Sequence, residues 1–239
     1  MKNLYDYLTE SVLDNIEDTL SDENAIKEGI IDFIKNHYNG GLYKWVTISD
    51  KPNKKGVYEV SYYSIVEFNG DYPTLTNGNF VWKEVGENFI AGSFRKRNNQ
   101  LETLEGAPEK IKKGCMFVCS NCPKLKNLKG APKHSGGIDC SECDNLESLE
   151  GAPKKVHTFK CARCPKLDSL KYGPMDVINF DCSDCTSLKS LEHAPKKCER
   201  EFRCYGCATE FTEEDVKAVC TMDERRGDIT CIDWSKKRF

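Results

Sequence analysis

Residues 156–170 read VHTFKCARCPKLDSL, and elements of this stretch recur at a nearly fixed spacing along the chain. The most visible element is a Cys-x-x-Cys pair, which occurs at Cys119/Cys122, Cys140/Cys143, Cys161/Cys164, Cys182/Cys185 and Cys204/Cys207. Successive pairs are 21, 21, 21 and 22 residues apart, and a leucine pair such as Leu167/Leu170 follows each of the first four. Repeats of this length predict a solenoid, in which each unit forms one turn and stacks on its neighbours.

The spacing within one unit predicts where each side chain points. Phe159 and Cys161 are two residues apart, so on a short strand both point to the same side, into the core. Cys161 is then a small buried core residue, which is common for a free cysteine. The corresponding core residues of the five units are Phe117, Ile138, Phe159, Phe180 and Phe202. An imperfect earlier copy, FRKRNNQLETLEGAP, begins at Phe94, with Phe94 as the expected core residue and Asn99 in place of the second Cys.

The unit Val156-x-x-Phe159-x-Cys161-x-x-Cys164 resembles the leucine-rich repeat, which begins L-x-x-L-x-L and carries Asn or Cys three residues later. The resemblance covers about residues 94–208. It implies one parallel strand per turn, and it places Cys164 where the family has a turn residue that bonds the backbone of the next turn. It also implies a concave sheet face, a surface with which stacked repeats commonly bind other proteins.

Zinc and disulfides are the alternatives to a buried cysteine ladder. The N-terminal residues, MKNLYDYLTESVLDNIEDTL, lack the continuous apolar core of a signal peptide, so we expect a cytoplasmic protein, in which disulfides are rare. Zinc needs four ligands converging on one ion, and stacked pairs about 4.8 Å apart leave that geometry open. The Asn that replaces the second Cys in the earlier copy favours a ladder. We therefore expect no metal, no cofactor and no disulfide.

The flanking segments complete an expected α+β fold. Apolar residues at helical spacing predict a pair of helices over 4–20 and 26–34, interrupted at the cap-type residues SDEN. Strand-like segments at 42–48, 57–68 and 80–85 predict a small antiparallel sheet that covers the first turn. Thr212-x-x-Asp215 predicts the start of a C-terminal helical cap. The expected divisions are 1–41 (helical), 42–92 (antiparallel β), 93–208 (leucine-rich-repeat solenoid) and 209–239 (cap).

One residue of each unit lies between the inward Phe or Ile and the inward Cys and should face outward. This column reads Val118, Asp139, Lys160, Asp181 and Arg203. Its alternating charges can simply neutralise one another on neighbouring strands, or they can form a polar strip for a protein partner. The column two residues further on is small until it reaches Tyr205, a possible anchor for a partner. The candidate binding residues are therefore Asp139, Lys160, Asp181, Arg203 and Tyr205.

The first ten residues, MKNLYDYLTE, carry a second resemblance. They are similar to the capsid-targeting segments of internal head proteins in T-even-type tailed phages, and the matching residues are Met1, Lys2, Asp6, Tyr7, Leu8 and Glu10. This resemblance implies cleavage after Glu10 and a place in the virion. The alternative is that these residues are the first turns of an ordinary helix.

The sequence shows no recognisable catalytic motif, and a net charge of −3 gives no reason to expect nucleic acid or an anionic membrane as partner. The predicted function is that of a non-enzymatic, cytoplasmic leucine-rich-repeat protein that binds a protein partner through its solenoid. The alternative is a phage virion-associated protein packaged through its N-terminal segment.

Overall fold

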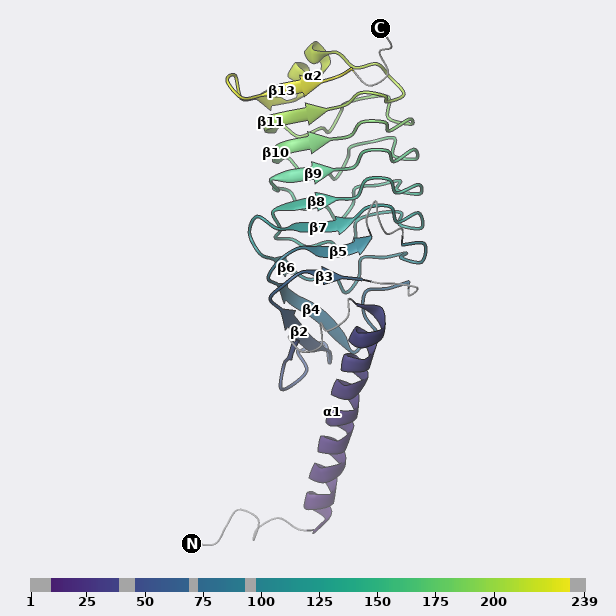
Figure 1. Ribbon diagram of the computed structural model, residues 1–239, viewed down its shortest axis with the longest axis vertical. Helices are drawn as coiled ribbons and strands as arrows, with labels where there is room; N and C mark the ends of the chain where they lie inside the picture. Colours follow the sequence, from purple (N-terminus) through teal and green to yellow (C-terminus); the bar gives the residue numbers. More distant parts are fainter. Residues whose placement is uncertain (1–9, 39–45, 69–72, 93–97, 233–239) are drawn as a thin grey trace.

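The computed structural model of the protein describes residues 10–38, 46–68, 73–92 and 98–232, with side chains from residue 22 onward. The chain forms a parallel β-solenoid of about seven turns stacked along the long axis of the molecule (Figure 1). A long helix, α1 (Glu10–His37), stands at one end of the stack, and a short helix, α2 (Glu213–Val219), lies at the other. The solenoid predicted from the repeats is confirmed.

The main sheet has nine strands, and consecutive turns place their strands side by side in it. From the N-terminal end the strands are β3 (Val66–Glu67), β5 (Phe89–Gly92), β7 (Met116–Cys119), β8 (Gly137–Asp139), β9 (Thr158–Lys160), β10 (Asp176–Asp181) and β11 (Lys197–Arg203). Two short strands, β12 (Thr221–Met222) and β13 (Asp228–Thr230), both pair with β11. Every pairing in this sheet is parallel, as the repeat register predicts.

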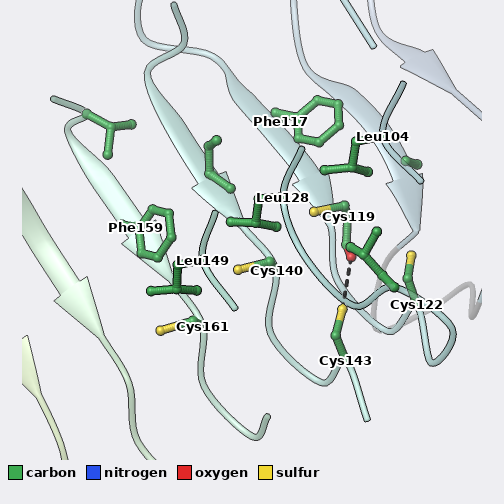
Figure 2. Packing of buried hydrophobic residues seen from close by; sticks show 14 of the residues in the cluster. Leu104, Phe117, Cys119, Cys122, Leu128, Cys140, Cys143, Leu149, Phe159 and Cys161 are labelled. Carbon is green, nitrogen blue, oxygen red and sulfur yellow. Dashed lines mark hydrogen bonds between the residues drawn. The ribbon is translucent and has the colours of Figure 1, made fainter. Parts of the chain in front are cut away.

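The register places the predicted core residues in a single column. Phe117, Ile138, Phe159, Phe180 and Phe202 pair in order across neighbouring strands, and each is at most 1% exposed. The rings of Phe159 and Phe180 stack with their centroids 6.1 Å apart. Figure 2 shows how Phe117, Phe159 and the leucines of the opposite wall fill the space inside the turns.

The predicted small antiparallel sheet over 42–92 is wrong, because this region forms the first turns of the same solenoid. A second sheet contains β1 (Thr47–Ile48), β2 (Tyr58–Tyr62), β4 (Phe80–Val85) and β6 (Lys110–Ile111). Its β2–β4 and β4–β6 pairs are parallel, and β1–β2 is its antiparallel pair. Tyr58 pairs with Phe80, 22 residues later, so the repeat length persists here although the Cys and Leu pattern does not.

The earlier copy of the repeat also differs from its prediction. Phe89, rather than Phe94, pairs with Phe117 in the core column, and Phe94 lies outside the described residues. Asn98, rather than Asn99, takes the second-Cys position: it is 3% exposed, whereas Asn99 is exposed. Asn98 lies three residues before Leu101, the same separation as between Cys164 and Leu167, so spacing alone identifies the correct residue.

Helix α1 runs unbroken from Glu10 to His37, so the prediction of two helices interrupted at SDEN is wrong. Ser, Asp and Asn favour helix caps, but without a Gly or Pro nothing in 21–24 forces the helix to end. The C-terminal part of α1 buries Ile30, Phe33 and Ile34. Phe33 meets Phe80 edge-on, with ring centroids 5.9 Å apart, and thereby joins the helix to the solenoid.

An aromatic cluster fills the solenoid next to α1. Its buried members are Phe33, Tyr38, Phe68, Phe80, Trp82 and Phe89. The polar atoms of this cluster are satisfied, since Tyr38 donates its hydroxyl proton to the Leu75 carbonyl at 2.5 Å and accepts the Trp82 indole N–H at 2.9 Å. Burial raises the pKa of Tyr38, so its hydroxyl remains a donor.

At the C-terminal end, α2 begins at the predicted position. Thr212 and Asp215 form a reciprocal capping box, each bonding the backbone N–H of the other. The open edge of β11 is covered by β12 and β13, which both follow α2 in sequence. The helix is thus confirmed, whereas the sheet edge itself is covered by strands.

Candidate functional site

The two cysteines of each pair have different surroundings. Each first Cys (Cys119, Cys140, Cys161, Cys182 and Cys204) is fully buried beside the aromatic column. From the second unit onward, each second Cys donates its S–H to the carbonyl oxygen of the first Cys in the preceding turn. The family resemblance implied a bond to the next turn, so the direction of this contact differs from the prediction. The pairs are Cys143 to Cys119 at 3.3 Å, drawn in Figure 2, Cys164 to Cys140 at 3.3 Å, Cys185 to Cys161 at 3.1 Å and Cys207 to Cys182 at 3.2 Å.

The buried environment keeps these thiols protonated, so they act as hydrogen-bond donors within the fold. Burial is the main cause that raises the pKa values of Cys119, Cys140 and Cys164 well above the ordinary thiol range. A protonated thiol can donate a hydrogen bond but is a poor nucleophile and a poor metal ligand. All fourteen cysteines lie in the described part of the chain and are free thiols, and among the described residues no group of three or more Cys, His, Asp or Glu is arranged to hold a metal ion.

In three of the five units the residue before the second Cys is charged, and these three residues form a ladder that was not predicted from the sequence. Glu142, Arg163 and Asp184 occupy this turn position with φ values of 59°, 56° and 56°. The Arg163 guanidinium lies 2.7 Å from the Glu142 carboxylate and 3.7 Å from the Asp184 carboxylate. Charges of alternating sign therefore neutralise one another at this edge of the sheet. The sequence could have predicted this ladder, because each of the three residues directly precedes the second Cys of its unit.

The predicted outward column is present as a row of direct strand neighbours. Val118 pairs with Asp139, Asp139 with Lys160, Lys160 with Asp181, and Asp181 with Arg203. Four charged side chains, here called the polar column, thus lie in line across β8 to β11: Asp139, Lys160, Asp181 and Arg203. Lys160 is exposed, and the other three are half-buried.

The hydrogen bonds and short ion pairs of the polar column are made mainly with residues outside it. Asp139 accepts the Ser141 N–H at 3.1 Å, and Asp181 accepts the Ser183 N–H at 3.0 Å. Arg203 pairs with Glu201 of its own strand at 2.5 Å. Within residues 98–232, no ion pair of 4.0 Å or less joins Lys160 to either aspartate beside it. Lys160 is thus exposed without a short ion pair to its strand neighbours, while Asp181 and Arg203 interact through their charges.

The neighbouring small column is less open than the sequence suggested. Ser120, Ala162 and Ser183 are buried, with exposed fractions of 6%, 9% and 2%, while Ser141 and Tyr205 are half-buried. Tyr205 lies at the end of the column nearest α2, and its carbonyl accepts the Asp184 N–H at 2.7 Å. A partner at this face would meet the polar column directly, with Tyr205 at one side.

The N-terminal prediction is untested by the described residues. Met1, Lys2, Asp6, Tyr7 and Leu8 lie outside them, and Glu10 is the first residue of α1. Cleavage after Glu10 and packaging into a virion therefore stay predictions.

Comparison with known proteins leaves the family open. Neither the models of known protein families, nor curated proteins, nor solved structures match this chain. In the described part of the chain, neither helix combines the length and apolarity needed to span a bilayer. The candidate function therefore depends on the geometry of this chain alone.

Proposed function

We propose that this chain is a non-enzymatic, leucine-rich-repeat-type protein that binds a protein partner through the polar column of its parallel sheet. The observation that carries the proposal is the column itself. Charges of alternating sign stand in register on four neighbouring strands, and the central Lys160 is exposed without an ion-pair partner among the described residues.

Two features favour the leucine-rich-repeat type. Each of the five Cys-pair units carries Phe or Ile two residues before its first Cys, on a short parallel strand, and two units also have Val at the first position, Val156 and Val177. The residue three positions after the first Cys bonds a neighbouring turn's backbone through Cys143, Cys164 and Cys185. Asn98 bonds the Ala91 carbonyl from the equivalent position, and Asn and Cys are the two residues that the repeat type uses there.

The charge pattern favours a protein as the partner. Strand neighbours lie about 4.8 Å apart, so the polar column presents charges of changing sign over roughly 15 Å. A peptide or a second protein can match such a pattern, and complementary charges give specificity and faster association. Tyr205, at one end of this face, supplies an aromatic contact of the kind enriched in protein interfaces.

A binding role, rather than catalysis, is also favoured by the surroundings of the cysteine thiols and of two histidines. The buried thiols are held protonated, and two of the repeat imidazoles belong to turns or bridges. His134 forms an isolated parallel bridge with Lys110, and His193 adopts a turn conformation at φ 66° beside Glu192. These placements account for both residues structurally.

The test is a charge reversal with a matched control. Lys160→Glu should weaken capture of the native partner by at least about tenfold, because it reverses the centre of the polar column. Lys154→Glu makes the same change in charge at an exposed turn position and should leave capture unchanged. The partner is identified by crosslinking from a photoreactive residue at position 160 and at position 154. Equal crosslinking from both positions, or equal capture by both variants, contradicts the proposal.

A further inference from the structure

The last turn of the solenoid brings two cysteines together from different strands. Cys204 follows β11 and Cys231 follows β13, and the register pairs Arg203 with Thr230 directly before them. The Cys204 N–H donates to the Thr230 carbonyl at 3.0 Å, so the parallel alignment continues past both strand ends. The two sulfur atoms are 3.5 Å apart. Cys231 thus extends the buried column of first cysteines by one position.

We propose that Cys204 and Cys231 are a modification site, at which a small disulfide such as oxidised glutathione converts the two thiols to a reversible disulfide bond. Neighbouring residues on parallel strands have Cα atoms about 4.8 Å apart, inside the roughly 4.4–6.8 Å range of natural disulfides. The sulfurs must approach from 3.5 Å to about 2.05 Å, a change that side-chain rotation at the half-exposed Cys231 can supply.

Access to Cys231 distinguishes this pair from the rest of the thiol column, since Cys204 is itself fully buried. Cys231 is half-exposed, and together with Cys207, Phe211 and Ile229 it lines a cavity of about 750 Å³ at the C-terminal end of the solenoid. The first cysteines of the earlier turns are fully buried. A small disulfide can therefore reach the Cys231 sulfur from this cavity, while the stacked turns cover the sulfurs further along the column.

The reaction is thiol–disulfide exchange in two steps. The Cys231 thiolate attacks one sulfur of the oxidant, forms a mixed disulfide and releases one small thiolate, which takes up a proton. Burial raises the pKa of Cys204, so its S–H gives up its proton to hydroxide in alkaline solution. The resulting thiolate attacks the Cys231 sulfur of the mixed disulfide and releases the second small thiolate, which takes up a proton. The two cysteines are oxidised, the oxidant is reduced to two thiols, and an excess of those thiols reverses both steps.

The consequence is a covalent tie between β11 and β13. The bond closes a loop that contains α2 and β12, so it restrains the element that covers the open edge of the sheet. Closing such a loop reduces the freedom of its opened state. Amide exchange of residues 228–231 should therefore slow by at least about tenfold in the oxidised protein.

The test treats the full-length protein with mixtures of oxidised and reduced glutathione at about pH 8.5, because burial raises the pKa values of Cys204 and Cys231 and alkaline solution increases their thiolate fraction. We expect a mass loss of about 2 Da, the two thiol hydrogens, with peptide mapping that joins Cys204 to Cys231. Cys231→Ser should abolish the mass loss and the slowed exchange. Cys220→Ser, the matched control at a buried thiol outside the pair, should keep both.

The result that overturns the proposal is a native protein that keeps its mass, or one that accumulates a stable glutathione adduct on Cys231 or Cys207. A disulfide that joins any other two cysteines, such as Cys182 and Cys207, also overturns it. If Cys231→Ser fails to fold, the peptide map of the unaltered chain still decides between these outcomes.

Discussion

The turns formed by residues 46–92 and those formed by residues 98–208 share one architecture and differ in the side chains that fill it. Both contribute parallel strands to the same sheet, and Phe89 of the first group lies directly beside Phe117 of the second. The later turns repeat a Cys and Leu pattern, whereas none of the fourteen cysteines precedes residue 115. The solenoid therefore depends on inward apolar residues at the right spacing and not on one particular residue type.

The two groups also satisfy their buried polar atoms differently. In the later turns four second cysteines, Cys143, Cys164, Cys185 and Cys207, donate their S–H to a backbone carbonyl one turn back, so the same contact is repeated by identical residues. In the earlier turns a single chain of hydrogen bonds runs from Trp82 through Tyr38 to Leu75. The repeated S–H contacts therefore contribute to stability in several turns, whereas the hydrogen bonds of the aromatic cluster contribute to it at one end of the solenoid.

The largest difference between the two groups should be in alkaline solution. The buried thiols stay protonated because burial raises their pKa values, while unfolded thiols ionise above about pH 8.5. Stability should therefore be complete below that pH and fall as pH rises above it, by about 1.4 kcal/mol per pH unit for each such thiol. Urea unfolding followed from pH 8 upward measures this slope. Cys164→Asn should reduce it by one thiol's share, and a slope unchanged by the variant contradicts the account.

Truncation of one large buried ring in each group of turns should lower the free energy of unfolding by a similar amount, but should loosen different parts of the chain. Phe159→Ala and Trp82→Ala each remove a fully buried ring and should each cost roughly 3–5 kcal/mol. Because contacts in a solenoid are made mainly between neighbouring turns, hydrogen exchange should accelerate most around β8 to β10 for Phe159→Ala and around β2 to β5 for Trp82→Ala. Uniform acceleration across the chain in both variants would show that the two groups are one cooperative unit.

A smaller effect should come from the turns between leucine pairs and strands. Gly151 has a φ of 103°, and a Cβ there would overlap the Leu128 carbonyl oxygen, so Gly151→Ala should cost at least about 1–3 kcal/mol. His193 takes the equivalent position at φ 66°, and His193→Gly should be between neutral and about 1 kcal/mol stabilising. Thermal unfolding of the two variants compares them, and the account fails here if Gly151→Ala is as stable as the unaltered protein.

The smallest effect should come from exchanging the two second-position residues. Cys164→Asn should change stability by less than about 1 kcal/mol, because Asn98, at the equivalent position, is buried and also donates to a backbone carbonyl, that of Ala91 in its own turn. Asn98→Cys is the reciprocal change and should be tolerated to a similar degree. Chemical denaturation gives both values. If Cys164→Asn instead loses a bound metal ion together with the fold, the thiols are ligands and the ladder interpretation is wrong.

The sequence predicted the register of the later turns because their period is carried by identical residues. Phe159 and Cys161 point inward, and Asp139, Lys160 and Asp181 form an outward column, as the spacing required. The earlier turns were missed because their period of 22 residues is carried by different residues, such as Tyr58 and Phe80. Spacing from the leucines would have identified Asn98, but hydrogen bonds such as those of Asp139 and Asp181 depend on local backbone geometry that a single sequence does not reveal.

The most direct measurement of the cysteine ladder is the reactivity of all fourteen thiols in the native, fully reduced protein. A small alkylating reagent should modify Cys115, Cys207 and Cys231, which are half-exposed, and should leave the eleven buried cysteines unmodified until the protein unfolds. Peptide mapping after a short native treatment identifies each modified residue. Rapid native modification of Cys140, Cys161 or Cys164 would contradict the account, because it would place these thiols outside the core of the solenoid.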